Sequence, residues 1–179
     1  MAKAAPGDLE LIRQFVNTFD VEDGTDELAD PHALGSWLAQ RDLIAADDAL
    51  AAHDLTRARR VREALRGLLL ANNGVPLDPA ALDAINEASA NAELLARFDR
   101  SGAAALAPAR GGLDGALARL LAIAVEAMRD GTWPRLKACA EDACEAAFYD
   151  WSRNRSGTWC SMSVCGNRAK ARTYRSRHR

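Results

Sequence analysis

Apolar residues recur every three or four positions through much of the first 134 residues, which is the spacing of helices with one buried face. Four segments show this pattern, and a capping residue or a glycine marks an end of each. They are the segment that Asp30 and Pro31 open, the segment that Asp47 or Asp54 caps and Asn72-Asn73-Gly74 ends, the segment that Asp78 and Pro79 open, and the segment from Leu113 to Gly131.

Two other stretches are less regular. Residues 9–19 mix helix and strand character, and residues 93–109 hold two short apolar patches around Gly102. Apolar patches joined by a glycine favour an irregular β-hairpin. We therefore expect a mainly α fold, in which residues 1–134 form a helical domain with one short hairpin.

The pattern changes after Pro134. Phe148, Tyr149 and Trp151 fall in a strand-like run, residues 153–157 are rich in turn formers, and the tail is rich in Ala, Lys and Arg. This order predicts a hairpin followed by a helix in residues 135–179, and a domain boundary near residues 131–134.

Charge divides the chain at the same place. Residues 1–134 carry 13 basic and 21 acidic side chains, whereas residues 135–179 carry 10 basic and 4 acidic ones. No acidic residue follows Asp150. The net charge of −2 therefore hides a cationic C-terminal part, and such a part favours nucleic acid as a partner.

All four cysteines lie in the second part, as two Cys-x4-Cys pairs: Cys139 with Cys144, and Cys160 with Cys165. Two close pairs are typical of one structural Zn²⁺ ion, because each pair supplies half of a tetrahedron. Disulfides or free thiols are the alternatives, but the first residues contain no apolar signal core, so we expect a reducing, cytoplasmic location. No apolar run approaches the roughly 20 residues that cross a bilayer, so we expect no membrane span. A 45-residue segment is also near the lower limit for folding without a metal. The predicted unit is a treble-clef-like zinc finger, with Cys165 in the first turn of its helix.

The predicted C-terminal helix carries two cationic stripes. The first stripe runs from Arg168 to Arg179, and its four arginines fall within an arc of roughly 60°. It is therefore better placed than the second stripe to face a DNA groove. A tail that only keeps the chain soluble is the alternative. The candidate nucleic-acid contacts are Arg168, Arg172, Arg175 and Arg179 on the first stripe, Lys170 and Arg177 beside Tyr174 on the second, and Arg153 and Arg155 at the hairpin tip.

Residues 1–134 show no pattern that is typical of an enzyme. His32 and His53 lack a Ser or Cys partner at a recognised spacing, so we expect no catalytic residues. A run of arginines is predicted to form the solvent face of its helix: Arg57, Arg59, Arg60, Arg62 and Arg66. Four aromatic residues could stack on bases, but a small zinc domain needs them as its core: Trp133, Phe148, Trp151 and Trp159.

The last 45 residues contain a specific series of motifs: Arg135-Leu136-Lys137-x-Cys139-x4-Cys144, then Phe148-x-Asp150-x-Ser152-Arg153-Asn154, then Trp159-Cys160-x-Met162-x2-Cys165-Gly166-Asn167-Arg168-x-Lys170. This series resembles the CGNR zinc-finger family. The upstream motifs Phe15-Val16-Asn17-Thr18 and Leu34-x2-Trp37-Leu38 resemble the ABATE domain, which commonly precedes this finger and is described in terms of stress-induced transcription regulation. The resemblance implies a bacterial DNA-binding regulator.

The hypothesis from the sequence is therefore a transcription regulator that binds double-stranded DNA through a zinc-stabilised basic helix. The N-terminal domain would sense a small-molecule effector or form a homodimer, and the protein would be cytoplasmic and nucleoid-associated. A zinc-stabilised adaptor whose basic face docks an acidic protein is the main alternative. An enzyme housed in residues 1–134 is the other.

Overall fold

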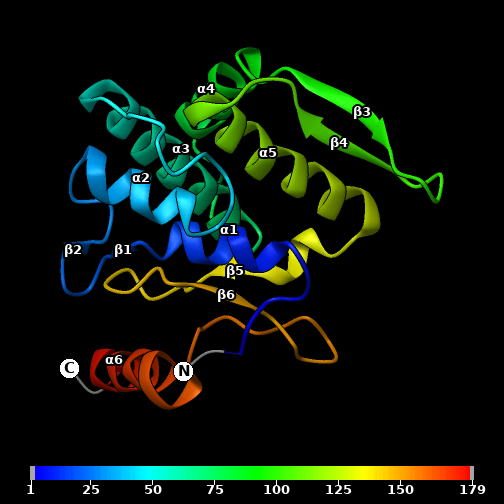
Figure 1. The fold of residues 1–179 in the computed structure, drawn as a ribbon. Coiled ribbons are helices and arrows are strands. Elements are labelled where there is room, and N and C mark those ends of the chain that lie inside the picture. Colours follow the sequence, from blue (N-terminus) through cyan, green and yellow to red (C-terminus); the bar gives the residue numbers. More distant parts are fainter. Residues whose placement is uncertain (1–2, 178–179) are drawn as a thin grey trace.

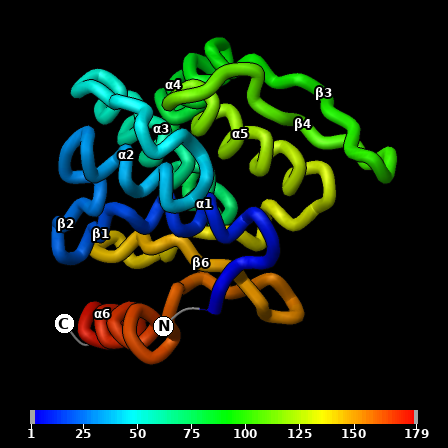
Figure 2. The backbone as a smooth tube through the Cα atoms, in the orientation of Figure 1, coloured from blue at the N-terminus to red at the C-terminus, as the bar shows by residue number. Residues whose placement is uncertain are grey.

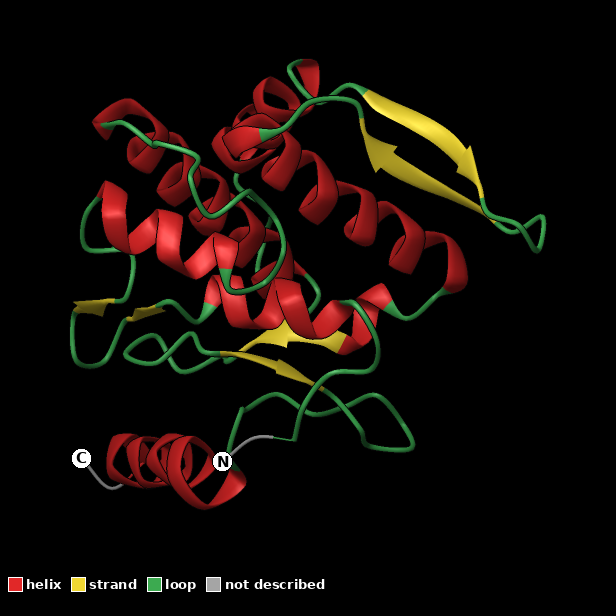
Figure 3. Cartoon of the chain, viewed as in Figure 1, coloured by secondary structure: helices red, strands yellow, loops and turns green. Residues whose placement is uncertain are grey.

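The computed structural model describes residues 3–177, which form six α-helices and three antiparallel strand pairs (Figure 1, Figure 3). The helices are α1 (Leu9–Val16), α2 (Pro31–Ala39), α3 (Ala52–Ala71), α4 (Pro79–Ala90), α5 (Gly112–Asp130) and α6 (Asn167–Arg177). The strand pairs are β1 (Phe19–Asp20) with β2 (Thr25–Asp26), β3 (Leu94–Phe98) with β4 (Ala104–Pro108), and β5 (Leu136–Ala138) with β6 (Ala147–Tyr149).

The four predicted helices are confirmed as α2, α3, α4 and α5, and their ends follow local chemistry. The carboxylates of Asp30 and Asp78 each accept a hydrogen bond from the first turn of the helix that follows, at 2.8 and 2.9 Å. Of the two candidate caps of α3, Asp54 is the one that accepts, from the backbone N–H just before the helix. α5 ends at Gly131, whose φ of +77° is left-handed and suits glycine.

The two less regular stretches form a helix with a strand and a hairpin. Residues 9–19 contain α1 and the start of β1, and residues 93–109 turn back at Gly102 as the irregular hairpin that the sequence predicts. This hairpin, β3 with β4, projects from the helical body (Figure 2). The fold is therefore mainly α with small hairpins, as predicted.

One hydrophobic core joins the helices to the strand pair β5–β6, which lies below α1 in Figure 1. Leu136 is fully buried, and Ala138, Ala147 and Tyr149 belong to the same cluster as the buried faces of α1, α3 and α5. A division of the chain between residues 134 and 135 stays a prediction. The two parts nevertheless share one packed interior, so we do not expect them to unfold independently.

Three asparagines that follow helices hold β5 and β6 in place. Asn17 donates to the carbonyl of Ala147 at 2.9 Å and accepts from its N–H at 2.7 Å, as a neighbouring strand would. Asn72 and Asn73 follow α3, and their amide groups donate to backbone carbonyls, two of which, those of Trp133 and Thr158, also accept a backbone N–H. They donate at 2.7–3.0 Å to the carbonyls of Trp133, Leu136, Ala138 and Thr158.

Replacing Asn73 with Ala is expected to destabilise the protein by roughly 1–3 kcal/mol, because the Ala138 carbonyl loses its Asn73 donor and the Thr158 carbonyl keeps only the N–H of Ala140. Urea unfolding gives the measurement. Asn91→Ala is the control, because Asn91 donates only within its own exposed helix end, and we expect a change within about 0.5 kcal/mol. Equal losses from the two variants would mean that Asn73 does not hold the two parts together.

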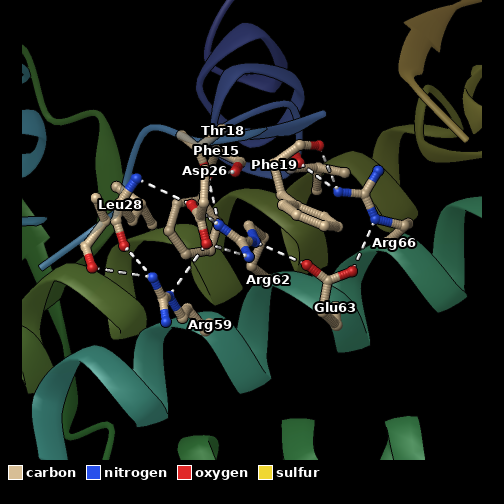
Figure 4. Close-up of polar contacts among 11 residues, drawn as sticks. Phe15, Thr18, Phe19, Asp26, Leu28, Arg59, Arg62, Glu63 and Arg66 are labelled. Carbon is tan, nitrogen blue, oxygen red and sulfur yellow. Dashed lines mark hydrogen bonds and ion pairs between the residues drawn. The ribbon is translucent and has the colours of Figure 1, made fainter. Parts of the chain in front are cut away.

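The arginines of α3 correct a prediction (Figure 4). Arg62 and Arg66 are each only 3 % exposed, whereas the sequence placed them on the solvent face of the helix. Arg62 forms an ion pair with Asp26 at 2.6 Å, and Arg66 donates to the carbonyls of Val16 and Phe19. The partners come from the end of α1 and from the segment between α1 and α2, 36 or more residues away, so helical periodicity could not show them.

The other three arginines of this run are also engaged. Arg57 pairs with Asp114, Arg60 pairs with Glu87, and Arg59 donates to the carbonyl of Leu28. Within the described chain this run therefore serves the fold, and it leaves α6 and the hairpin tip as the cationic surface.

Candidate metal centre and the basic helix beside it

The four cysteine sulfurs come together at one point. All four Sγ atoms lie within 4.8 Å of one another, and Cys144 Sγ lies 3.6 Å from Cys160 Sγ, which in turn lies 3.8 Å from Cys165 Sγ. A tetrahedral ion with sulfur ligands at roughly 2.3 Å requires sulfur–sulfur distances of about 3.8 Å. A disulfide needs about 2.0 Å, and all four cysteines are free thiols. The arrangement fits a metal-binding site and not two disulfides.

The first cysteine pair sits on a turn directly after β5. The N–H of Cys139 donates to the carbonyl of Ala146, and the N–H of Cys144 donates to the carbonyl of Glu141 at 2.7 Å. Glu145 then adopts a left-handed φ of 46°, which turns the chain into β6. Arg66 donates to the Glu145 carbonyl at 2.9 Å, so the buried arginine of α3 supports this turn.

The second pair ends in a turn of π-helix, Met162–Gly166, that runs directly into α6. Cys165 lies in this turn, two residues before Asn167, whereas the sequence placed it in the first turn of the helix. A Cβ atom at Gly166 would meet the sulfur of Met162 at 2.6 Å, so a side chain there would displace the exposed Met162 side chain. Because the π-helical turn continues into α6 without a break, the last cysteine and α6 form one helical segment.

The four thiols cannot all ionise without a cation. Hydrogen bonds from Cys144 and Cys160 lower the pKa of Cys139 to about 2, whereas hydrogen bonds to Cys139 and Cys144 raise the pKa of Cys160. Burial raises the pKa of Cys165 to about 12. One thiolate is therefore stabilised by the protons of its neighbours. A divalent cation at the centre would replace those protons, and the residues that would hold it are Cys139, Cys144, Cys160 and Cys165.

A buried ion pair shapes the loop of residues 150–157, which precedes the second cysteine pair. Lys137 on β5 is 5 % exposed and Asp150 after β6 is 4 % exposed. The Lys137 Nζ donates to Asp150 at 2.9 Å and to the carbonyls of Arg155 and Gly157, so all three of its protons are used. A Cβ atom at Gly157 would lie 2.8 Å from the Asp150 carboxylate, so a side chain there would break the contact. The sequence contains both charges in its motif, but nothing in it indicates that they pair.

The Asp150 carboxylate is held ionised. Burial alone would raise its pKa, but hydrogen bonds from Ser152, Lys137 and the backbone lower the pKa to about 2 from an ordinary value of 3.8. The loop of residues 150–157 therefore depends on a charged Asp150.

The first stripe of α6 faces the rest of the protein. Arg168 forms an ion pair with Glu22 at 2.7 Å, and Arg172 donates two hydrogen bonds of 2.7 Å to the buried carboxylate of Glu141. The hydrogen bond from Arg172 lowers the pKa of Glu141. Arg175 donates to a carbonyl of its own helix at 3.3 Å, and Arg179 lies outside the described residues. That these arginines contact nucleic acid stays a prediction.

The second stripe lines a shallow groove of about 370 Å³ with Trp159. Lys170 and Arg177 flank it, and in the described chain no carboxylate lies within ion-pair distance of either. The same holds for the side chains of Arg153 and Arg155 at the hairpin tip.

The four aromatics divide into two groups. Trp133 and Phe148 are buried, as a zinc-domain core requires, but Trp151 is 47 % exposed and Trp159 is half-buried. Trp151 donates to the carbonyl of Ala4 and lies under the amino group of Lys3, 4.2 Å from the ring centre. The prediction of a core role is right for the first two residues only.

Comparison with known families agrees with this architecture. The family model described as "CGNR zinc finger" matches residues 135–178. The ABATE model, described as "Putative stress-induced transcription regulator", matches residues 9–145, which is more than half of the chain. The chain belongs to the ABATE family. It carries a CGNR zinc finger after the ABATE domain, as the motifs of the sequence predict.

The ABATE match runs to residue 145 and so includes β5 and the first cysteine pair. This overlap with the finger agrees with the core that the two parts share. The family descriptions are those of a regulator and a zinc finger, not of an enzyme. No curated protein matches the sequence. In residues 3–177, every helix is too short or too polar to span a bilayer.

Proposed function

We propose that this ABATE-family protein is a DNA-binding transcription regulator whose four cysteines hold one structural zinc ion. The observation that carries the proposal is the position of α6, a cationic helix that begins directly after the last of the four clustered sulfurs. No acidic residue follows Asp150, so this surface has the sign that phosphates require.

Zinc would act structurally. Four thiolates complete a tetrahedral shell and leave no position for a water or a substrate. The ion would join the turn after β5 to the turn before α6, and it would thereby fix the helix relative to the ABATE domain.

The basic side chains of α6 and of the hairpin tip differ in whether they are free to bind phosphates. Arg153, Arg155, Lys170 and Arg177 can reach phosphates without losing a protein partner in the described chain. Arg168 and Arg172 would have to exchange Glu22 and Glu141 for phosphates. We therefore place the first phosphate contacts on the former group and on Arg175, with at least one arginine in position to read a guanine edge.

The ABATE domain would sense a small-molecule effector. A groove of about 680 Å³ lies between α2 and the loop that follows it, and polar side chains such as His32, Ser36 and Gln40 line it. We propose this groove for a small-molecule effector, and a homodimer in the cytoplasm, close to the nucleoid, as the working state. Screening effectors by thermal shift tests the first point, and light scattering tests the second.

Affinity for a DNA duplex is expected to fall steeply with salt. If about four cations touch phosphates, a slope of roughly −0.9 per contact predicts a loss of about 10² in affinity between 50 and 200 mM salt. Replacing Lys170 and Arg175 with Ala should flatten the slope by up to about two units. Fluorescence anisotropy with a labelled duplex gives the measurement.

Arg97→Ala with Arg100→Ala is the matched control, because it removes the same charge from the exposed β3–β4 hairpin, far from α6. We expect its slope to equal that of the unchanged protein. A similar effect of both double variants would move the DNA-binding surface away from α6. Absence of duplex binding at 50 mM salt would support instead the adaptor whose basic face docks an acidic partner.

A further inference from the structure

The groove beside α6 combines aromatic rings with cations that have no ion-pair partner in residues 3–177. Trp159 comes from the segment before the second cysteine pair, and Lys170, Tyr174 and Arg177 come from α6. Ala169 and Thr173 form the rest of the lining, and both are small. Tyr174 is 65 % exposed, so a ligand in the groove can reach its side chain.

The orientation of α6 explains why this face is open. The ion pairs of Arg168 with Glu22 and of Arg172 with Glu141 hold the opposite face of the helix against the protein. Figure 1 shows α6 below the body, beside the hairpin of β1 and β2 that carries Glu22 in its turn. The stripe of Lys170, Tyr174 and Arg177 is therefore the one that faces outward.

We propose that this groove binds a single unpaired base of a nucleic acid, which stacks on Tyr174 and Trp159 while Lys170 and Arg177 contact the flanking phosphates. Aromatic side chains stack on any base because every base has a π-face, and cations beside them hold the backbone. A base inside a perfect duplex is covered on both faces by its neighbours, so only a bulged, terminal or single-stranded base can enter. A volume of about 370 Å³ lies in the range of small-ligand sites.

This inference rests on the proposed function in one respect, because it assumes that the basic surface meets nucleic acid. It adds a site and a class of ligand to that function. The small lining residues matter to it, since a larger side chain at Ala169 or Thr173 would fill the space that a base needs.

Three probes of one sequence test the inference: a duplex closed at both ends by stable loops, the same duplex with one bulged 2-aminopurine, and the single strand. Each is made as DNA and as RNA. We expect the full-length, zinc-loaded protein to bind the bulged probe about 5- to 100-fold more tightly than the closed duplex. The fluorescence of 2-aminopurine should fall on binding, because stacking quenches it.

Tyr174→Leu should remove both the preference and the quenching, whereas Tyr174→Phe should keep both. Tyr174 is exposed on α6, so these changes leave the core intact. Phe98→Leu is the control, because Phe98 is another exposed aromatic residue, on the β3–β4 hairpin, and it should leave the preference unchanged.

The outcomes separate the two proposals. Equal binding of bulged and closed duplexes, or a preference that survives Tyr174→Leu, overturns the inference and leaves the DNA-binding function in place. Binding of the bulged and single-stranded probes without binding of the closed duplex supports the groove and overturns duplex recognition. A preference shown by the RNA probes alone also supports the groove, and it identifies RNA as the partner.

Discussion

Removal of the metal by a zinc chelator is expected to disorder α6 and residues 158–166 while most of the helical signal remains. Structural zinc contributes roughly 10–16 kcal/mol of apparent binding free energy in comparable modules. By comparison, the ion pairs of Arg168 with Glu22 and of Arg172 with Glu141 involve exposed arginines, so they stabilise α6 only weakly. Circular dichroism at 222 nm should fall only slightly, because α6 has 11 residues whereas α3 has 20 and α5 has 19. Metal analysis of the purified protein should give about one zinc per chain.

Cys160→Ser should reproduce the effect of the chelator. Ser161→Ala is its control, because Ser161 neighbours the ligand but its hydroxyl contacts only Ser163 at the surface. A reduced protein that stays fully folded without bound metal would contradict the structural role of zinc. A loss of helical signal across the whole chain would show that the shared core depends on the ion.

Asp150→Ala is expected to destabilise the protein by about 3–5 kcal/mol, because the change leaves the Lys137 ammonium buried without its counter-ion. The double variant with Lys137→Met should recover much of this loss, since it removes the unpaired charge. Lys170→Met, a change at an exposed lysine, is the control for the lysine substitution and should have little effect on stability. Thermal or urea unfolding of the unchanged protein, Asp150→Ala, Lys137→Met and the double variant gives the pairwise interaction free energy of Asp150 and Lys137.

The stabilisation that the Asp150 carboxylate provides depends on pH and weakens as the pH falls. The folded protein lowers the pKa of Asp150 to about 2 from 3.8, so the stabilisation is complete above about pH 4 and disappears as the pH falls towards 2. The shift corresponds to about 2 kcal/mol. Zinc release in acid affects the unchanged protein and Asp150→Asn alike, so the difference between their unfolding free energies isolates the carboxylate. A difference that stays constant from pH 6 to pH 3 would exclude this role.

Local chemistry predicted most of the elements. Asp30, Asp78 and Gly131 mark helix ends through contacts with their own neighbours, and the spacing of the cysteines is readable without the fold. The same reasoning failed for Arg62 and Arg66, because a helical wheel assigns arginine to solvent and cannot show an acidic hairpin folded over it.

The orientation of α6 could not be predicted from the sequence for the same reason. Four arginines on one face look equally suited to phosphate, but Glu22 and Glu141 lie far from α6 in the sequence and take two of them. The asparagines give a third example, since Asn17 reaches a strand 130 residues away. Each of these contacts joins elements whose proximity only the fold determines.

The interior shared by the ABATE domain and the finger also limits how the chain can be divided. A cut after Pro134 would leave one piece with the buried faces of α1 and α3 uncovered and another with Leu136 in water. Each piece would expose an apolar surface that packs against the other piece in the intact protein, as in fragment complementation. We therefore expect neither piece to fold alone, whereas the two pieces mixed in solution should reassociate into the complete fold.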